Sequence, residues 1–173
     1  MLFRVLLILL STVSWGGCKA AEVHHFVHEE TESDRKNLQW SKSDPKLGSE
    51  LTVNELPYFV VDFHRFWPGY SATAYLYVIQ RDKDPLRLES IEVKSEETGE
   101  VREVAIDINT SPKKLENGLH LFRYRILDAG SSGQFSEARS LQVRLNWIDR
   151  AEAKRSTEFE LEKKVKSEVA WPT

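Results

Sequence analysis

The residues of this chain with side chains suited to catalysis are few and widely spaced. Asp62 and His64 lie two positions apart, so a strand would place them on one face, and Ser71 could complete a Ser-His-Asp site with them. His120 is the other histidine of this region. The sequence has no His-Glu-x-x-His pair, Gly-x-Ser-x-Gly elbow or glycine-rich phosphate loop. These residues are explained more simply as solvent-facing positions of strands, so we expect no catalytic site.

His24, His25 and His28 form the one histidine cluster of the sequence. Imidazoles four positions apart can share a cation. No cysteine ligand follows them, and the surrounding residues are charged and turn-prone. We therefore expect neither a metal ion nor another cofactor.

Cys18 is the single cysteine of the 173 residues, and it follows an apolar N-terminal run. Arg4, the apolar stretch from Val5 to Val13 and the small residues after it form the three-part pattern of a secretory signal, residues 1–17. The run is too short to span a bilayer, which takes about 20 apolar residues. One cysteine cannot form an internal disulfide, so stability must come from burial of a core.

The residues Gly16-Gly17-Cys18 resemble the lipobox of bacterial lipoproteins, although Trp15 stands where that motif usually has Leu, Val or Ile. The resemblance implies that Cys18 is acylated, becomes the mature N-terminus and attaches the protein to a membrane. Lys19 replaces the aspartate that retains enteric lipoproteins in the inner membrane, which implies the periplasmic face of the outer membrane. The alternative is an ordinary signal peptide with a small-x-small cleavage site at Cys18-Lys19-Ala20.

Residues 18–49 predict a flexible tether behind the lipidated cysteine. The runs from Glu29 to Lys36 and from Ser41 to Lys46 are charged and poor in apolar side chains. Such segments bury too little to order themselves. A coil of this length would reach on the order of 30 Å and hold a domain clear of a membrane.

Residues 50–170 predict an all-β domain, because apolar residues recur at every second position between turns. Residues 72–80 are apolar on both faces, as in a strand covered on two sides. Glu97-Thr98-Gly99 predicts a hairpin tip. The segment 157–169 fits a capped helix or an edge strand, and its alternation favours the strand. About seven strands at short spacing are typical of an antiparallel sandwich. The predicted core positions with this alternation are Phe59, Val61, Phe63, Phe122, Tyr124, Ile126, Leu141, Val143, Leu145 and Trp147.

The segment 115–143 has a Leu-x-x-Gly turn, an aromatic and arginine-rich strand, a Gly/Ser loop and Ser136-Glu137-Ala138. It resembles the last two strands of a fibronectin type III or related immunoglobulin-like module, which implies an immunoglobulin-like antiparallel β-sandwich. Where such modules place a corner tyrosine, this chain has Phe122 or Leu121. The corner hydrogen bond is therefore expected to be absent, or to come from Tyr124.

Three aromatic residues flank a Pro-Gly bend in Phe66-Trp67-Pro68-Gly69-Tyr70. The bend prevents regular alternation, so the three rings cannot all enter one core. Large rigid rings on loops are favoured anchors of binding surfaces. Phe66, Trp67 and Tyr70 are therefore predicted to contact a partner. The alternative is that the rings fold back and plug the open end of the sandwich.

The charge balance argues against nucleic-acid binding, because 24 basic and 27 acidic residues give a net charge of −3. We expect a cell-envelope lipoprotein, facing the periplasm, that serves as a non-catalytic binding or structural accessory module for a protein partner. The alternative is a periplasmic inhibitor or immunity protein that covers the active site of a toxin or lytic enzyme. A small secreted hydrolase is less favoured, because it would need His64 or His120 inside a pocket.

Overall fold

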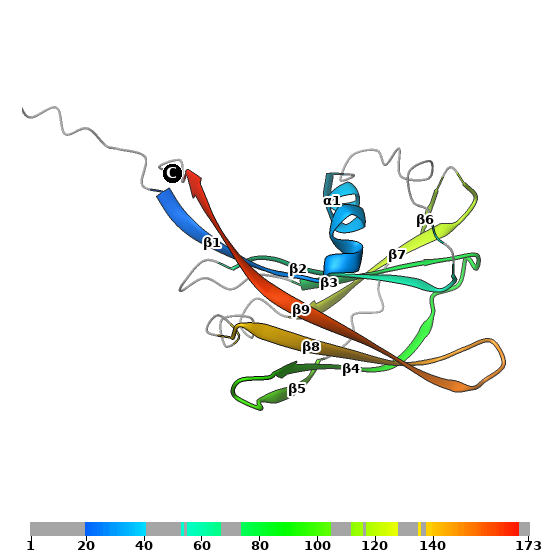
Figure 1. Ribbon diagram of the computed structural model, residues 1–173. Coiled ribbons are helices and arrows are strands. Elements are labelled where there is room, and N and C mark those ends of the chain that lie inside the picture. Colours follow the sequence, from blue (N-terminus) through cyan, green and yellow to red (C-terminus); the bar gives the residue numbers. More distant parts are fainter. Residues whose placement is uncertain are drawn as a thin grey trace, which may run out of the picture.

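The computed structural model describes residues 20–40, 53, 55–66, 74–104, 112–115, 117–127, 135 and 138–169. These residues form a mainly β structure with one antiparallel sheet of nine strands in the order β5-β4-β8-β9-β1-β2-β3-β7-β6 (Figure 1). The strands are β1 (Ala20–Val27), β2 (Tyr58–Phe66), β3 (Ala74–Gln80), β4 (Arg87–Ser95), β5 (Val101–Val104), β6 (Lys113–Lys114), β7 (His120–Leu127), β8 (Ser140–Ile148) and β9 (Lys154–Val169). A 3-10 turn, η1 (Glu29–Thr31), leads into helix α1 (Glu32–Trp40).

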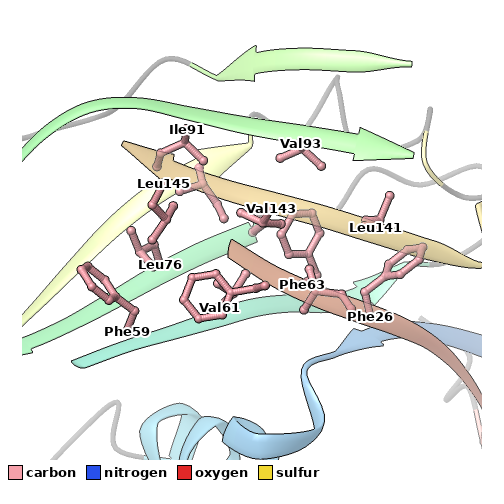
Figure 2. Packing of buried hydrophobic residues seen from close by; sticks show 14 of the residues in the cluster. Phe26, Phe59, Val61, Phe63, Leu76, Ile91, Val93, Leu141, Val143 and Leu145 are labelled. Atoms are coloured by element: carbon pink, nitrogen blue, oxygen red, sulfur yellow. The ribbon is translucent and has the colours of Figure 1, made fainter. Parts of the chain in front are cut away.

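The sheet curls, so that its two halves face each other across the main hydrophobic core. Figure 2 shows side chains of β1, β2 and β3 pointing toward side chains of β4 and β8. The period of two that strands impose puts every second residue on this inner face. The predicted alternation in β2, β7 and β8 is confirmed. The buried residues of these three strands in the core are Phe59, Val61, Phe63, Phe122, Tyr124, Ile126, Leu141, Val143 and Leu145, with Trp147 packed against them.

A second, smaller core lies on the outer face of β2, β3 and β7, under α1 (Figure 1). Leu38 of the helix is buried there with Val60 of β2, and with Tyr77 and Ile79 of β3. Strand β3 therefore contributes to both cores, as expected of a strand apolar on both faces. Helix α1 therefore packs on the outer face of this half of the sheet.

Each predicted strand has a counterpart in the structure, and the hairpin at Glu97-Thr98-Gly99 is confirmed. The backbone N–H of Ser95 donates to the carbonyl of Glu100 at 2.9 Å, and Gly99 closes the turn with a φ of +67°. The segment 157–169 is part of β9, which confirms the strand rather than the helix. Strands β1 and β6 were not predicted, so the sheet has nine strands instead of about seven.

The predicted tether is wrong over the residues that the structure describes there. Strand β1 lies in the middle of the sheet, paired with β2 on one side and β9 on the other. Its Phe26 is fully buried in the main core, where its ring meets the edge of Phe63 at a centroid distance of 6.3 Å. Pairing with distant strands orders a segment that is too polar to order itself. The signal segment 1–17, Cys18 and residues 41–49 lie outside the described residues.

The strand order differs from that expected of a fibronectin-like module. Strands β7 and β8 carry the resemblance, but β7 pairs with β3 and β6, whereas β8 pairs with β4 and β9. Tyr124 does not make a local corner bond either. Its hydroxyl donates to the carbonyl of Leu86, 38 residues away, at 3.4 Å. The structure therefore shows a mainly β fold with a curled antiparallel sheet.

Tyr124 makes the stability of this fold sensitive to alkaline pH. Burial raises its pKa to about 12 from an ordinary value of 10. The folded state therefore holds the phenolic proton more tightly than the unfolded state. This stabilisation is complete below pH 10 and is lost as the pH rises from 10 to about 12.

We expect Tyr124→Phe to flatten the alkaline part of the stability profile. At pH 7 it should cost about 1 kcal/mol or less, since the lost hydrogen bond is long. Urea unfolding between pH 8 and 12 measures both effects. A decline between pH 10 and 12 that is equally steep in the variant and the wild type would contradict the assignment to Tyr124. Burial also raises the pKa values of Tyr58 and Tyr77, so part of the decline should remain in the variant.

Candidate binding face

Most of the side chains that the sequence marks for function fall where the structure is not described. Cys18, Trp67, Tyr70 and Ser71 lie outside the described residues. Phe66 is described in its backbone, as the last residue of β2 and the partner of His24 in β1. Their predicted roles in lipid attachment and partner binding therefore stay predictions.

The histidines are distributed among separate environments. His120 places its Nδ1 3.1 Å from the carbonyl oxygen of Arg81. His25 is buried in β1, and His28 follows the strand, with its Nδ1 3.2 Å from the hydroxyl of Thr31. Because β1 is extended and ends at Val27, the helical spacing that could let His24 and His28 share a cation does not exist. Within the described part of the chain, no group of three or more His, Cys, Asp or Glu side chains could hold a metal ion.

An arginine–tyrosine face, made of Tyr75, Tyr77, Arg123 and Arg125, lies on the outer side of β3 and β7. The strand register pairs Tyr75 with Arg125 and Tyr77 with Arg123. Alternation places all four on the face opposite the main core, because Leu76 and Tyr124 between them point inward. Arg123 and Arg125 are exposed, Tyr75 is half-buried and Tyr77 is buried.

The guanidinium of Arg123 lies over a tyrosine ring. Its Cζ atom is 4.9 Å from the centroid of the Tyr75 ring, within the range of a cation–π contact. The Tyr75 and Tyr77 rings are neighbours at 6.3 Å between centroids. The arginine therefore reaches diagonally across the strand pair and rests on an aromatic base, with its charged group at the surface.

A buried ion pair lies next to this face, between α1 and β2. Arg35 Nη1 is 3.4 Å from Asp62 Oδ1, and the two side chains are only 6% and 2% exposed. Asp62 is the partner of Tyr75 in the register of β2 and β3. Burial first, and then the Asp62 carboxylate, raise the pKa of the neighbouring Tyr77 phenol. Tyr77 therefore stays uncharged across the physiological range.

A second polar contact fixes the helix at the start of the same strand. The hydroxyl of Tyr58 donates to Oδ2 of Asp34 at 2.6 Å. Burial raises the pKa of Tyr58, and the hydrogen bond to Asp34 and the negative charges of Asp34 and Glu30 add to the increase. Adjacent residues of α1 thus bind residues 58 and 62 of β2, which holds the helix in a fixed place beside the arginine–tyrosine face.

The face is continuous through the backbone with the predicted aromatic turn. Phe66 ends β2 and Ala74 begins β3, so residues 67–73 connect the two strands directly before Tyr75. The predicted aromatic turn therefore directly precedes this face in the chain, and residues 67–73 lie outside the described residues. The alternating arginines of β7 are visible in the sequence, but their link to Tyr75 is not, because it depends on the register between β3 and β7.

Comparison of this chain with protein-family models, with curated proteins and with solved structures finds no match. In the parts of the chain that the structure describes, no helix has the length and apolar character to cross a membrane.

Proposed function

We propose that this protein is a cell-envelope lipoprotein that acts as a non-catalytic binding module, and that its arginine–tyrosine face binds an acidic segment of a protein partner. The observation that carries the proposal is the exposed guanidinium of Arg123 held over the Tyr75 ring, with exposed Arg125 on the same face. Chemically, this arrangement is a preformed cationic surface on a rigid sheet.

Preorganisation is what makes such a surface suitable for binding. An exposed arginine normally loses rotamer freedom when it binds, and that loss opposes association. Stacking on an aromatic ring restricts Arg123 before a partner arrives, while the edge of its guanidinium keeps N–H donors for a carboxylate. Arg125 lies two residues along β7 on the same face, so its Cα is roughly 7 Å from that of Arg123. An extended peptide with alternating Asp or Glu residues would match that spacing.

The remaining parts of the proposal come from the sequence. The lipobox-like residues support an acylated Cys18 and a location on the periplasmic side of the outer membrane. Phe66, Trp67 and Tyr70 extend the proposed surface through the turn that precedes Tyr75. An immunoglobulin-like sandwich is also a proposal: two halves of the sheet packed across one core support it, whereas the separation of β7 from β8 argues against the fibronectin arrangement.

Charge reversal at Arg123 tests the proposed surface. We expect Arg123→Glu to weaken partner recovery at least 30-fold, since loss of a hot-spot arginine costs about 2 kcal/mol or more of binding energy. The measurement is cross-linking in cells of the native source, followed by affinity recovery and quantitation of the attached proteins. Higher NaCl concentration during recovery without cross-linking should weaken binding further, because the contact is between exposed charges.

Arg144→Glu is the matched control. Arg144 is also an exposed arginine at the centre of a strand, but it belongs to β8 and pairs with Glu158 and Glu92. It should leave recovery nearly unchanged. Arg123→Glu should melt close to the wild type, whereas Arg144→Glu should melt somewhat lower, because its new carboxylate lies opposite Glu92 and Glu158. Equal recovery with wild type and Arg123→Glu would refute the binding face. If a captured partner were an enzyme that this protein inhibits stoichiometrically, the module would be an inhibitor acting through the same face.

A further inference from the structure

Strand β9 changes partners along its length, and its last part extends past the body of the sheet. From Lys154 to Glu162 it pairs with β8, and from Glu162 to Val169 it pairs with β1. Strand β8 begins at Ser140, opposite Glu162. Strand β2 still pairs with β1 as far as His24, so the β1–β9 pair becomes a two-stranded ribbon over residues 20–23 and 166–169, which Figure 1 shows leaving the sheet beside the C-terminal label.

The register brings both ends of the ribbon to one point. Ala20, the first residue of β1, is the partner of Val169, the last residue of β9. Cys18 precedes Ala20 by two residues in the sequence, so its Cα lies at most about 7.6 Å from that of Ala20. If Cys18 carries the lipid, the anchor attaches directly to the tip of the ribbon and not to a long flexible coil.

We propose that the β1–β9 ribbon is a rigid stalk that stands on the phospholipid bilayer with the Ala20 and Val169 end toward the lipid. This inference rests on the proposed acylation of Cys18. The surface near the ribbon suits that position: Lys166 is an exposed cation that can meet anionic headgroups, and the adjacent Val165 is 53% exposed. In the sequence, Trp171 follows Val169 by two residues, and tryptophan favours the membrane interface.

A rigid stalk fixes which part of the domain faces away from the membrane. Strands rise about 3.3 Å per residue, so Ser156 lies roughly 36 Å from Ser167 if β9 runs straight. The turn between β8 and β9 is then at the far side of the domain from the bilayer. A flexible tether would allow every orientation and give no such gradient.

Two serines of the same strand provide a matched pair of reporter positions. Ser167 and Ser156 are both exposed in β9. Ser167 lies near the tip of the stalk, and Ser156 lies near the start of the strand. The full chain would be purified from membranes as Ser167→Cys or Ser156→Cys. Acylation blocks Cys18, so the new cysteine is the one free thiol, and it is labelled with bimane. The proteins are reconstituted into phosphatidylethanolamine and phosphatidylglycerol vesicles that contain lipid with a nitroxide on the headgroup.

We expect the lipid nitroxide to remove most of the bimane fluorescence at position 167 and none at position 156. A water-soluble nitroxide should quench both labels, which shows that both are accessible. Equal quenching at the two positions, or no quenching at either, would overturn the stalk orientation. Mass spectrometry of the same preparations determines acylation independently. An unacylated Cys18 would overturn the proposed anchoring and the stalk together, whereas an acylated Cys18 without the gradient would overturn the stalk alone.

Discussion

Phe26→Ala should lower the free energy of unfolding by about 3 to 5 kcal/mol, the range for removal of a buried aromatic ring. Phe26 is fully buried in the main core, and its ring packs edge-on against Phe63. It is also the residue that ties β1 to both neighbours, because its register partners are Phe63 in β2 and Lys163 in β9. The cavity would open where the two halves of the sheet meet.

Urea unfolding monitored by circular dichroism measures this loss. Glu29→Ala, three residues further on and exposed, is the control and should change stability by no more than about 0.5 kcal/mol. The comparison separates a folded segment from a tether. If Phe26→Ala cost as little as the control, residues 20–27 would not belong to the folded core.

The strands that can be predicted from the sequence are those whose own residues alternate clearly between apolar and polar. In β2 and β8, alternation of large apolar and polar side chains specifies both the strand and its inner face, because a slip of one residue would expose that whole face. Strand β9 was ambiguous by itself, since its charges also suit a helix. Its buried positions Phe159 and Leu161 show that packing against the main core decides the matter.

Strand β1 and helix α1 could not be predicted in the same way. The sequence of β1, AAEVHHFV, contains little apolar alternation, and the strand forms because β2 and β9 supply hydrogen-bonding partners on both sides. In α1, Leu38 is buried, and Asp34 and Arg35 attach the helix to β2. Their partners lie 24 and 27 residues away, so no local pattern reveals them.

The candidate face was hidden for a related reason. In the sequence, Arg123 is a solvent-facing residue of an alternating strand, and Tyr75 belongs to a strand apolar on both sides. Neither description implies a site. The face exists because the register between β3 and β7 sets an arginine diagonally across from a half-buried ring. Strand register and order are properties of the whole sheet, and they are also where the fibronectin-like expectation differs from the structure.

Asp62→Ala should lower the free energy of unfolding by about 3 to 5 kcal/mol, because it leaves the charge of Arg35 buried without its carboxylate. The pair is 3.4 Å apart and nearly inaccessible to water. Within the described part of the chain, Arg35 Nε makes no hydrogen bond, so this guanidinium already depends heavily on Asp62. Removal of the carboxylate should loosen α1 from β2, next to the arginine–tyrosine face.

An exposed pair in the other half of the sheet gives the control. Arg144 Nε lies 2.6 Å from Glu158 Oε1, closer than the buried pair, but both side chains are nearly half exposed. Water and salt screen that attraction, so Glu158→Gln should cost about 1 kcal/mol or less. The shorter contact should thus matter less, because burial rather than distance sets the penalty for an unpaired charge.

The double variant Arg35→Met with Asp62→Leu separates the pair's charge from its packing. Replacing both ions with apolar side chains of similar size removes the unpaired charge, and such exchanges are often neutral or stabilising. We therefore expect the double variant to recover most of the stability lost in Asp62→Ala, as measured by urea unfolding. If the double variant were as unstable as the single one, the polar contacts themselves, and not charge compensation, would hold α1 on the sheet.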